Sequence, residues 1–250
     1  MEALRVEKLS KSFGRVQAVN DVSLIVASGE RRAVIGANGA GKTTLFNLIA
    51  GEFHPSTGKV YFFGRDITDM PQHHRSHMGL ARTYQINSLF LRLPVLDNVV
   101  LAVQSHQQLR YQMIRSATAY HRVFDRAKAL MEQIGLWQKR DALVQDIGYG
   151  EQRQIEMALA LACNPKVLLM DEPTAGLSAA ETEAVINMIR SLGNDMTTII
   201  VSHDMDVVFQ IADKISVLCF GELIASGNPA EIRADPKVQS IYLGSEACAR

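Results

Sequence analysis

The chain has 250 residues, and its 26 Lys and Arg residues balance its 26 Asp and Glu residues. Hydrophobic residues make up 47% and charged residues 21%, which suits a packed core and excludes an intrinsically disordered chain. A balanced charge gives no general attraction to nucleic acid or anionic lipid, so we expect no nucleic-acid partner.

The cysteines and the apolar runs set further limits. Cys163, Cys219 and Cys248 match neither a disulfide framework nor the spacing of metal ligands, which favours a reducing compartment. No apolar run approaches the ~20 residues that cross a bilayer, and the N-terminus lacks an apolar signal segment. We therefore expect a soluble chain, held at a membrane by another protein if it works there.

The first third of the chain predicts strands followed by a helix. Apolar residues within 1–30 mostly recur with a period of two, as in a half-buried sheet, and 31–35 form a short apolar strand. Helical spacing begins at Thr43 and continues to Ala50, where Gly51 ends it.

Residues 86–165 differ because their pattern is mainly helical. One predicted helix carries Val123, Ala127, Leu130 and Ile134 on a single face. The region reads as a helical subdomain inserted into an α/β core. A solvated helix pair and a docking surface explain it equally well.

Strands resume after this region. Residues 166–170, 197–201 and 215–220 are short apolar or β-branched runs, and Ser178 with Glu181 has the spacing of a helix capping box. Alternating strands and helices indicate a largely parallel sheet covered on both faces. We divide the single domain into a mainly antiparallel β part (1–30), a core (31–85 and 166–220), the helical subdomain (86–165) and a C-terminal tail (221–250).

The segment GANGAGKTT fits the phosphate-loop pattern G-x-x-x-x-G-K-[ST]. Glycines let backbone N–H groups point at phosphate oxygens, and the following helix N-terminus adds a partial positive charge. Lys42 would reach the β- and γ-phosphates, and the Thr43 hydroxyl would hold Mg²⁺. The loop residues that we expect to bind ATP are Asn38, Gly39, Ala40, Gly41, Lys42, Thr43 and Thr44.

Acidic residues and a histidine follow two later strands. Asp171 and Glu172 end the run VLLMDEP, at the strand edge where ligands collect, so Asp171 would hold Mg²⁺ and Glu172 would polarise the attacking water. His203 follows the strand at 197–201 and would hydrogen-bond the γ-phosphate or that water. The sequence therefore predicts a hydrolytic ATP site in an α/β P-loop (RecA-like) fold.

These motifs together resemble the ATP-binding subunits of ABC transporters over nearly the whole chain. Phe13 matches the aromatic position that stacks on adenine, and Gln85 matches the catalytic glutamine that touches Mg²⁺ and links the site to the membrane domains. The segment DEPTAGLS contains the loop that crosses to a partner subunit. Ile147 and the ATP-contacting residues Gly148, Tyr149, Gly150 and Glu151 occupy the place of the LSGGQ signature.

More narrowly, the stretches GLARTYQ, YGEQRQIEMALALACNPKVLLMDEPTAGLS and GELIASGNPAEIRADPKVQSIYLG resemble the subfamily for branched-chain amino acid uptake. Within it the chain is closer to the LivG type than to the LivF type. Similar cassettes serve urea, short amides or aromatic acids, so these substrates stay open.

The resemblance implies a head-to-tail dimer in which two ATP molecules lie between one subunit's phosphate loop and the other's signature. The second subunit is a different, LivF-like ATPase or another copy. The resemblance also implies membrane permease subunits, for which Ile86–Asn98 is the candidate docking segment. It further implies an extracytoplasmic binding protein and a peripheral place on the cytoplasmic face of the inner membrane.

Two positions depart from the family pattern. Gly148 replaces the signature serine, whose hydroxyl bonds the γ-phosphate, and Ser178 stands where the crossing loop often has Asp. One neutral hydrogen bond contributes about 0.5–1.5 kcal/mol, so we expect a weakened grip across the interface and a different ATPase as partner.

Other functions fit less well. A soluble ABC-type ATPase of translation would carry two cassettes, and one of DNA repair would show sustained heptads, which are absent. A non-hydrolysing nucleotide binder would not need Asp171, Glu172 and His203 together. A P-loop GTPase would carry an Asn-Lys-x-Asp motif, which the sequence lacks.

Overall fold

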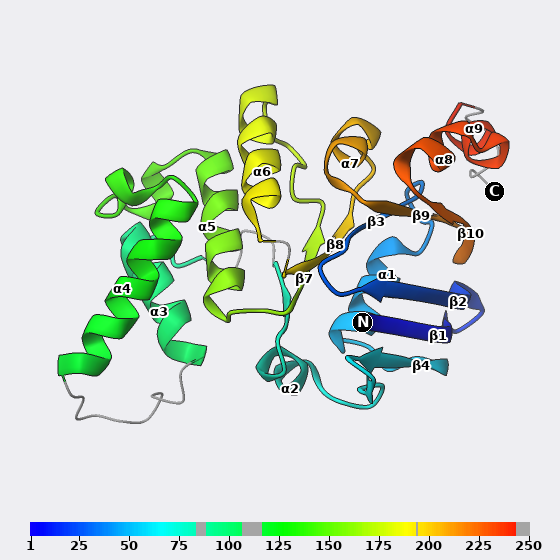
Figure 1. Cartoon of the computed structure of the whole chain (residues 1–250), viewed down its shortest axis with the longest axis horizontal. Coiled ribbons are helices and arrows are strands. Elements are labelled where there is room, and N and C mark those ends of the chain that lie inside the picture. Colours follow the sequence, from blue (N-terminus) through cyan, green and yellow to red (C-terminus); the bar gives the residue numbers. More distant parts are fainter. Residues whose placement is uncertain (84–88, 107–116, 194, 244–250) are drawn as a thin grey trace.

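The computed structural model of the chain describes residues 1–83, 89–106, 117–193 and 195–243. Two sheets lie next to each other, and a group of helices stands at one side (Figure 1). This architecture confirms the predicted α/β class. Among the described residues, no helix is both long and apolar enough to span a bilayer.

The first sheet is antiparallel, with the strand order β2-β1-β4-β5. Its strands are β1 (Glu2–Phe13), β2 (Val16–Ala27), β4 (Thr57–Phe62) and β5 (Arg65–Asp66). We expected 31–85 to belong wholly to the core, but β4 pairs with β1 instead. The reason is apolar burial, because Val60 and Phe62 turn inward beside Leu4 and Val6.

The second sheet has the order β10-β9-β3-β8-β7-β6. Its strands are β3 (Arg31–Ile35), β6 (Leu80–Arg82), β7 (Val167–Asp171), β8 (Thr197–Val201), β9 (Lys214–Cys219) and β10 (Glu222–Gly227). All are parallel except β10, which pairs antiparallel with β9. We expected residues 221–250 to form a C-terminal tail and did not predict β10, because this edge strand is only partly buried and shows no clear alternation.

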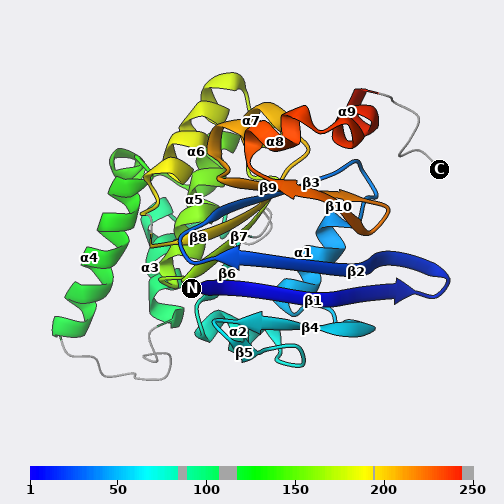
Figure 2. The ribbon, with the colours of Figure 1, turned by 45° about the vertical axis from the view of Figure 1, so that its right-hand side comes forward.

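Helices cover both faces of the second sheet. Helix α1 (Lys42–Ala50) lies between the two sheets (Figure 2), and its apolar side chains pack with Val167 and Leu169 of β7. On the opposite face, Leu168 and Met170 pack in a cluster with α5 (Tyr149–Ala162) and α6 (Ala179–Ser191). The remaining helices here are α2 (Gln72–His77), α7 (Met205–Ile211), α8 (Pro229–Ala234) and α9 (Pro236–Leu243).

The helical group comprises α3 (Val95–His106), α4 (Ala117–Gln133) and α5 (Tyr149–Ala162), with short 3-10 turns at Trp137–Lys139 and Val144–Asp146. The four residues predicted on one helical face are all buried in one cluster: Val123, Ala127, Leu130 and Ile134. Helix α5 also contacts α6 and β6, so it joins this group to the core.

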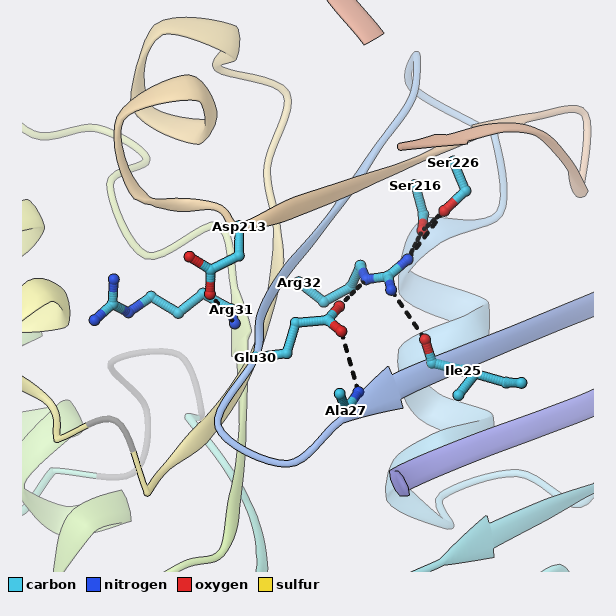
Figure 3. Close-up of polar contacts among 8 residues, drawn as sticks. All are labelled: Ile25, Ala27, Glu30, Arg31, Arg32, Asp213, Ser216 and Ser226. Carbon is cyan, nitrogen blue, oxygen red and sulfur yellow. Dashed lines mark hydrogen bonds and ion pairs between the residues drawn. The ribbon is translucent and has the colours of Figure 1, made fainter. Parts of the chain in front are cut away.

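A buried arginine connects the two sheets. Arg32 on β3 pairs with Glu30 at 2.5 Å and donates to the hydroxyls of Ser216 and Ser226 at 2.9 and 3.0 Å (Figure 3). Its other terminal nitrogen donates to the Ile25 carbonyl of β2 at 2.9 Å. The side chain therefore reaches the first sheet and both C-terminal strands, and it fixes their separation.

A second buried arginine binds the C-terminal end of α1. Arg75 on α2 is 1% exposed and donates to the Leu48 and Ile49 carbonyls at the C-terminal end of α1, at 2.9 and 2.7 Å. Gly51 makes room for it, since a Cβ atom there would lie 2.6 Å from Arg75 Nε. Burial lowers the pKa of Arg75 to about 10, which leaves the guanidinium charged at neutral pH.

Candidate nucleotide site

The phosphate loop joins the end of β3 to the start of α1, as the motif requires. Gly36 and Gly41 allow backbone to pass very close, because a Cβ atom would lie 2.4 Å from the Leu218 carbonyl oxygen at the first and 2.3 Å from that of Ala18 at the second. Gly41 also takes a left-handed φ of 99° at the helix N-cap. The loop is therefore packed against β9 and β2, and its shape depends on glycine at both positions.

Lys42 is buried at the first position of α1, with its head folded over the loop. Its Nζ donates to the Gly36 and Ala37 carbonyls at 2.8 and 3.1 Å. Burial lowers the pKa of Lys42, while the charges of Glu172 and Asp171 act in the opposite direction. The ammonium group is thus held by two carbonyls of the loop and has one N–H left for a phosphate oxygen.

A cavity of about 380 Å³ opens in front of this loop. It brings together the predicted residues from Asn38 to Thr44 and Glu172. Its remaining lining residues were not predicted: Val16, Gln17, Ala18 and Phe220. Phe220 is 48% exposed in the turn between β9 and β10, whereas its sequence neighbours had placed it at the end of an apolar strand.

Phe13 does not line this cavity. It ends β1 and packs edge-to-face on Phe53, with ring centroids 5.5 Å apart, while Lys11 Nζ lies 5.3 Å from its ring centre. The residue is 46% exposed. Its contact with adenine stays a prediction.

At the end of β7, the carboxylate of Glu172 contacts His203. Glu172 takes a left-handed φ of 50°, which costs about 1–2 kcal/mol for a residue with a side chain. Its N–H donates to the Val201 carbonyl at 2.8 Å, and its Oε2 lies 2.5 Å from His203 Nδ1. The Glu172 carboxylate and the His203 ring are therefore in direct contact at this edge of the sheet, and the predicted contact of His203 with the γ-phosphate or the attacking water stays a prediction.

Arg82 at the end of β6 was not predicted as a site residue. Its Nη2 donates to Asp171 Oδ2 at 2.9 Å, and its Nη1 donates to Asn47 Oδ1 at 2.5 Å and Glu52 Oε1 at 2.8 Å. Arg82 thus joins the predicted metal carboxylate to the end of α1. The sequence offered a signal, since Arg82 stands in GLARTYQ, but the residue types alone do not reveal its partner.

The residues present suit Mg²⁺. A threonine hydroxyl at 43 and a carboxylate at 171 are hard oxygen donors, and Mg²⁺ typically uses one or two carboxylates together with phosphate oxygens. The described residues contain no cluster of three His, Cys, Asp or Glu side chains that would bind a metal without such help. Gln85, the third predicted metal-contacting residue, lies outside the described residues.

The signature loop, residues 147–151, does not contribute to this cavity. Ile147 is buried, Gly148 is the N-cap of α5, and Tyr149 is 42% exposed. Arg153 Nη2 donates to the Tyr149 hydroxyl at 3.0 Å and so fixes the ring. Within one chain, the phosphate loop and the signature loop form separate surfaces.

Two carboxylates already occupy N–H groups of the signature loop. The Gly148 N–H donates to Glu151 Oε2 at 3.1 Å, and Glu151 pairs with Lys139 at 2.5 Å. The Gly150 N–H donates to Glu181 Oε1 at 3.1 Å. Glu181 also forms the predicted capping box with Ser178, which is therefore confirmed.

The phosphate loop, the paired acids at the end of β7 and a separate signature loop define an ATP-binding cassette. Residues 19–175 match the ABC transporter family, and residues 222–248 match the branched-chain amino acid ATP-binding cassette transporter family. The chain belongs to the ABC transporter family, whose cassettes hydrolyse ATP to drive transport, and it is an ATPase of that kind.

Individual relatives show which ABC transporter subunits this chain resembles. The high-affinity branched-chain amino acid transport ATP-binding protein LivG of Salmonella typhimurium is 36% identical, over 96% of this chain and 97% of its own. The lipopolysaccharide export system ATP-binding protein LptB of Haemophilus influenzae is 33% identical, over 98% of this chain and 99% of its own. A crystal structure of the ADP conformation of an ATP-binding cassette of an ABC transporter matches this chain with a TM-score of 0.86 and 29% sequence identity. The match covers 98% of this chain and 99% of that structure's chain.

Proposed function

We propose that this ATPase powers an importer of branched-chain amino acids or of a related small polar solute. The observation that carries the proposal is the match of residues 222–248 to the branched-chain family, together with LivG relatives aligned over nearly the whole chain. The LptB relative is similar over the same length, so an exporter is the competing assignment. Urea, short amides and aromatic acids are the alternative cargoes.

Within this proposal, MgATP binds in the 380 Å³ cavity. The phosphate-loop N–H groups and Lys42 bind the phosphates, Thr43 and Asp171 would hold Mg²⁺, and the metal would offset negative charge on the phosphates. Glu172 accepts a proton from the attacking water, and His203 orients that carboxylate. Phe13 contacts adenine, and Gln85 reaches the metal.

The permease docks on the segment Ile86–Asn98. Its described part carries Phe90 and Leu91, which are 58% and 44% exposed and lie next to each other at the surface. Asn98 is buried and fixes this turn, because its Oδ1 accepts the Phe90 N–H at 2.8 Å and its Nδ2 donates to the Pro94 carbonyl at 3.0 Å. A rigid, apolar turn of this kind suits a protein partner.

The second ATPase subunit is a different, LivF-like chain rather than another copy. Gly148 supplies no hydroxyl, and the N–H groups at 148 and 150 already donate to carboxylates, so this chain grips a partner's ATP weakly. A partner with a complete signature would form the stronger half of the pair. The assembly lies peripherally on the cytoplasmic face of the inner membrane, and an extracytoplasmic binding protein delivers the solute.

Transport by the reconstituted system tests the proposal. The chain is combined with the permeases, the second ATPase and the binding protein of its transport system, and uptake of labelled leucine is compared with uptake of urea and an aromatic acid. We expect ATP-dependent leucine uptake that Glu172→Gln abolishes. Uptake of another cargo alone would reassign the solute, and ATP-driven export would refute the importer.

The docking segment has its own control. Leu91→Glu should release the chain from membranes that contain the permeases, whereas Ile25→Glu, an equally exposed apolar position on β2, should not. Co-sedimentation of the chain with those membranes measures both. Equal retention of the two variants would move the docking surface elsewhere.

A further inference from the structure

One carboxylate connects the signature loop to the crossing loop, residues 173–178. Glu181 Oε1 accepts the Gly150 N–H at 3.1 Å. Its Oε2 accepts the Ser178 N–H at 2.9 Å and the Ser178 hydroxyl at 2.6 Å. The two oxygens of one side chain are therefore divided between the two segments that resemble the family's interface loops.

This contact requires glycine at position 150. A Cβ atom there would lie 2.5 Å from Glu181 Oε1 and 2.7 Å from its carboxyl carbon, so any side chain would displace the carboxylate. A second contact supports the same approach, because a Cβ atom at Gly176 would lie 3.6 Å from the Tyr149 ring. The Glu181 carboxylate therefore occupies a position that depends on glycine at residue 150.

The Gly150 N–H is also a group that a phosphate would use. Free N–H groups in the first turn of a helix bind anions, and α5 is a helix of 14 residues. A carboxylate and a phosphate oxygen cannot accept the same N–H at full strength. Among the described residues, no lysine, arginine or histidine forms an ion pair with Glu181, so its charge would also repel an arriving phosphate.

We propose that Glu181 is a positioning residue that occupies the Gly150 N–H until the γ-phosphate of the second subunit's ATP displaces it. The inference rests on the proposed arrangement of ATP between two subunits. Displacement leaves the cap of α6 in place, since Ser178 bonds the other oxygen. Glu181 thereby sets the ATP concentration at which the two subunits close.

Closure can be measured directly. In a Glu172→Gln background, which blocks hydrolysis of the ATP bound by this chain, light scattering gives the ATP concentration for half-maximal dimer formation. The measurement is made with the chain alone and with the second ATPase, whose corresponding glutamate is also replaced by Gln because that subunit binds the ATP that meets Gly150. Glu181→Gln weakens a charged acceptor to a neutral one and should lower that concentration about fivefold. A cap that only stabilised α6 would raise it instead, so an unchanged or raised value would overturn the inference.

The chain contains a matched control. Glu231 holds the same third position of α8, where its Oε2 accepts the Asn228 N–H at 2.8 Å, and α8 packs on β9, β10 and α9. Glu231→Gln therefore weakens a similar cap far from α5. Its half-maximal ATP concentration should stay within about twofold of the parent, because only a cap is affected.

Hydrogen exchange on the nucleotide-free chain separates the contact from the assembly. The Gly150 amide should exchange faster in Glu181→Gln than in the wild type or in Glu231→Gln. Equal exchange in all three would overturn the inference whatever the dimers do. If ATP dimerises none of the variants, including the parent, either alone or with the second ATPase, the proposed arrangement of ATP between two subunits is refuted instead.

Discussion

Two helix N-termini of this chain face phosphate in the proposed assembly, and they differ in what stands in front of them. Helix α1 begins at a glycine loop beside an open cavity of about 380 Å³. Helix α5 begins at the signature loop, where Glu151 and Glu181 accept the N–H groups of Gly148 and Gly150. The first site is shaped to receive an anion, whereas the second must first release one.

The two helices are also anchored at opposite ends. Arg75 holds the carbonyls at the C-terminal end of α1 and leaves its N-terminus clear. Helix α5 is held at its N-terminus by a residue of α6. Binding at the phosphate loop therefore requires little rearrangement, while engagement of the signature loop is linked to α6 and the crossing loop.

The largest effect should come from the carboxylate beside the open site. Glu172→Gln removes the proposed proton acceptor, and we expect ATP turnover to fall roughly 10²–10⁴-fold while ATP binding persists. Turnover by phosphate release and binding by a fluorescent ATP analogue measure the two effects. Near-normal turnover would refute the assignment of Glu172.

The rear anchor of α1 should matter for stability. Arg75→Met leaves buried carbonyls without their donor, and we expect a loss of about 3–5 kcal/mol in the free energy of unfolding. Urea denaturation measures it, with Arg65→Met, an exposed position on β5, as the control expected within about 0.5 kcal/mol. A loss at Arg75 as small as the control's would show that α1 does not depend on this anchor.

The fold and the open site could largely be predicted from the sequence, for a physical reason. Strand β3, the glycine loop and α1 are consecutive, so spacing alone carries the geometry of residues 36–44. The strands of the second sheet are short apolar runs, and their parallel order places Asp171 and His203 on one edge. The sequence did not predict β4, β5, α2, β6 or the partly buried β10, because these elements are short or pair with strands far away in the sequence.

The signature side could not be predicted in the same way. The partner of Gly150 is Glu181, 31 residues along the chain, and the partner of Asp171 is Arg82, 89 residues away. Contacts of this kind depend on the packing of whole elements. The capping box at Ser178 was predicted because it is local, but nothing local shows that Glu181 also serves a second helix.

A serine at position 148 would make the two N-termini more alike. The site has room, since a Cβ atom at Gly148 would meet only Glu151 Oε2, at 3.8 Å. One added donor contributes about 0.5–1.5 kcal/mol, so Gly148→Ser should lower the ATP concentration for dimer formation by about twofold to tenfold.

The same variant tests the choice of partner. If the purified chain hydrolyses ATP as fast as the complete complex, and Gly148→Ser changes neither rate nor dimer formation, the proposal of a different ATPase partner should be dropped. A gain seen only in the isolated chain would support it, because the complete complex already contains a stronger signature.

The smallest expected effect is on how the stability of the chain changes as the pH is lowered. Hydrogen bonds from the Ser178 hydroxyl, the Ser178 N–H and the Gly150 N–H lower the pKa of Glu181. Because the pKa is lower in the folded than in the unfolded chain, this contribution to stability is present above the ordinary glutamate value of 4.5 and is lost as the pH falls through the lowered value. The stability difference between wild type and Glu181→Gln should therefore shrink between pH 6 and pH 3, as read from urea midpoints. Glu183→Gln is the control, because Glu183 lies on the same helix and forms a 3.9 Å ion pair with Arg190. If the loss of stability in Glu181→Gln equals the loss in Glu183→Gln at every pH, the signature loop is not held by a charged carboxylate.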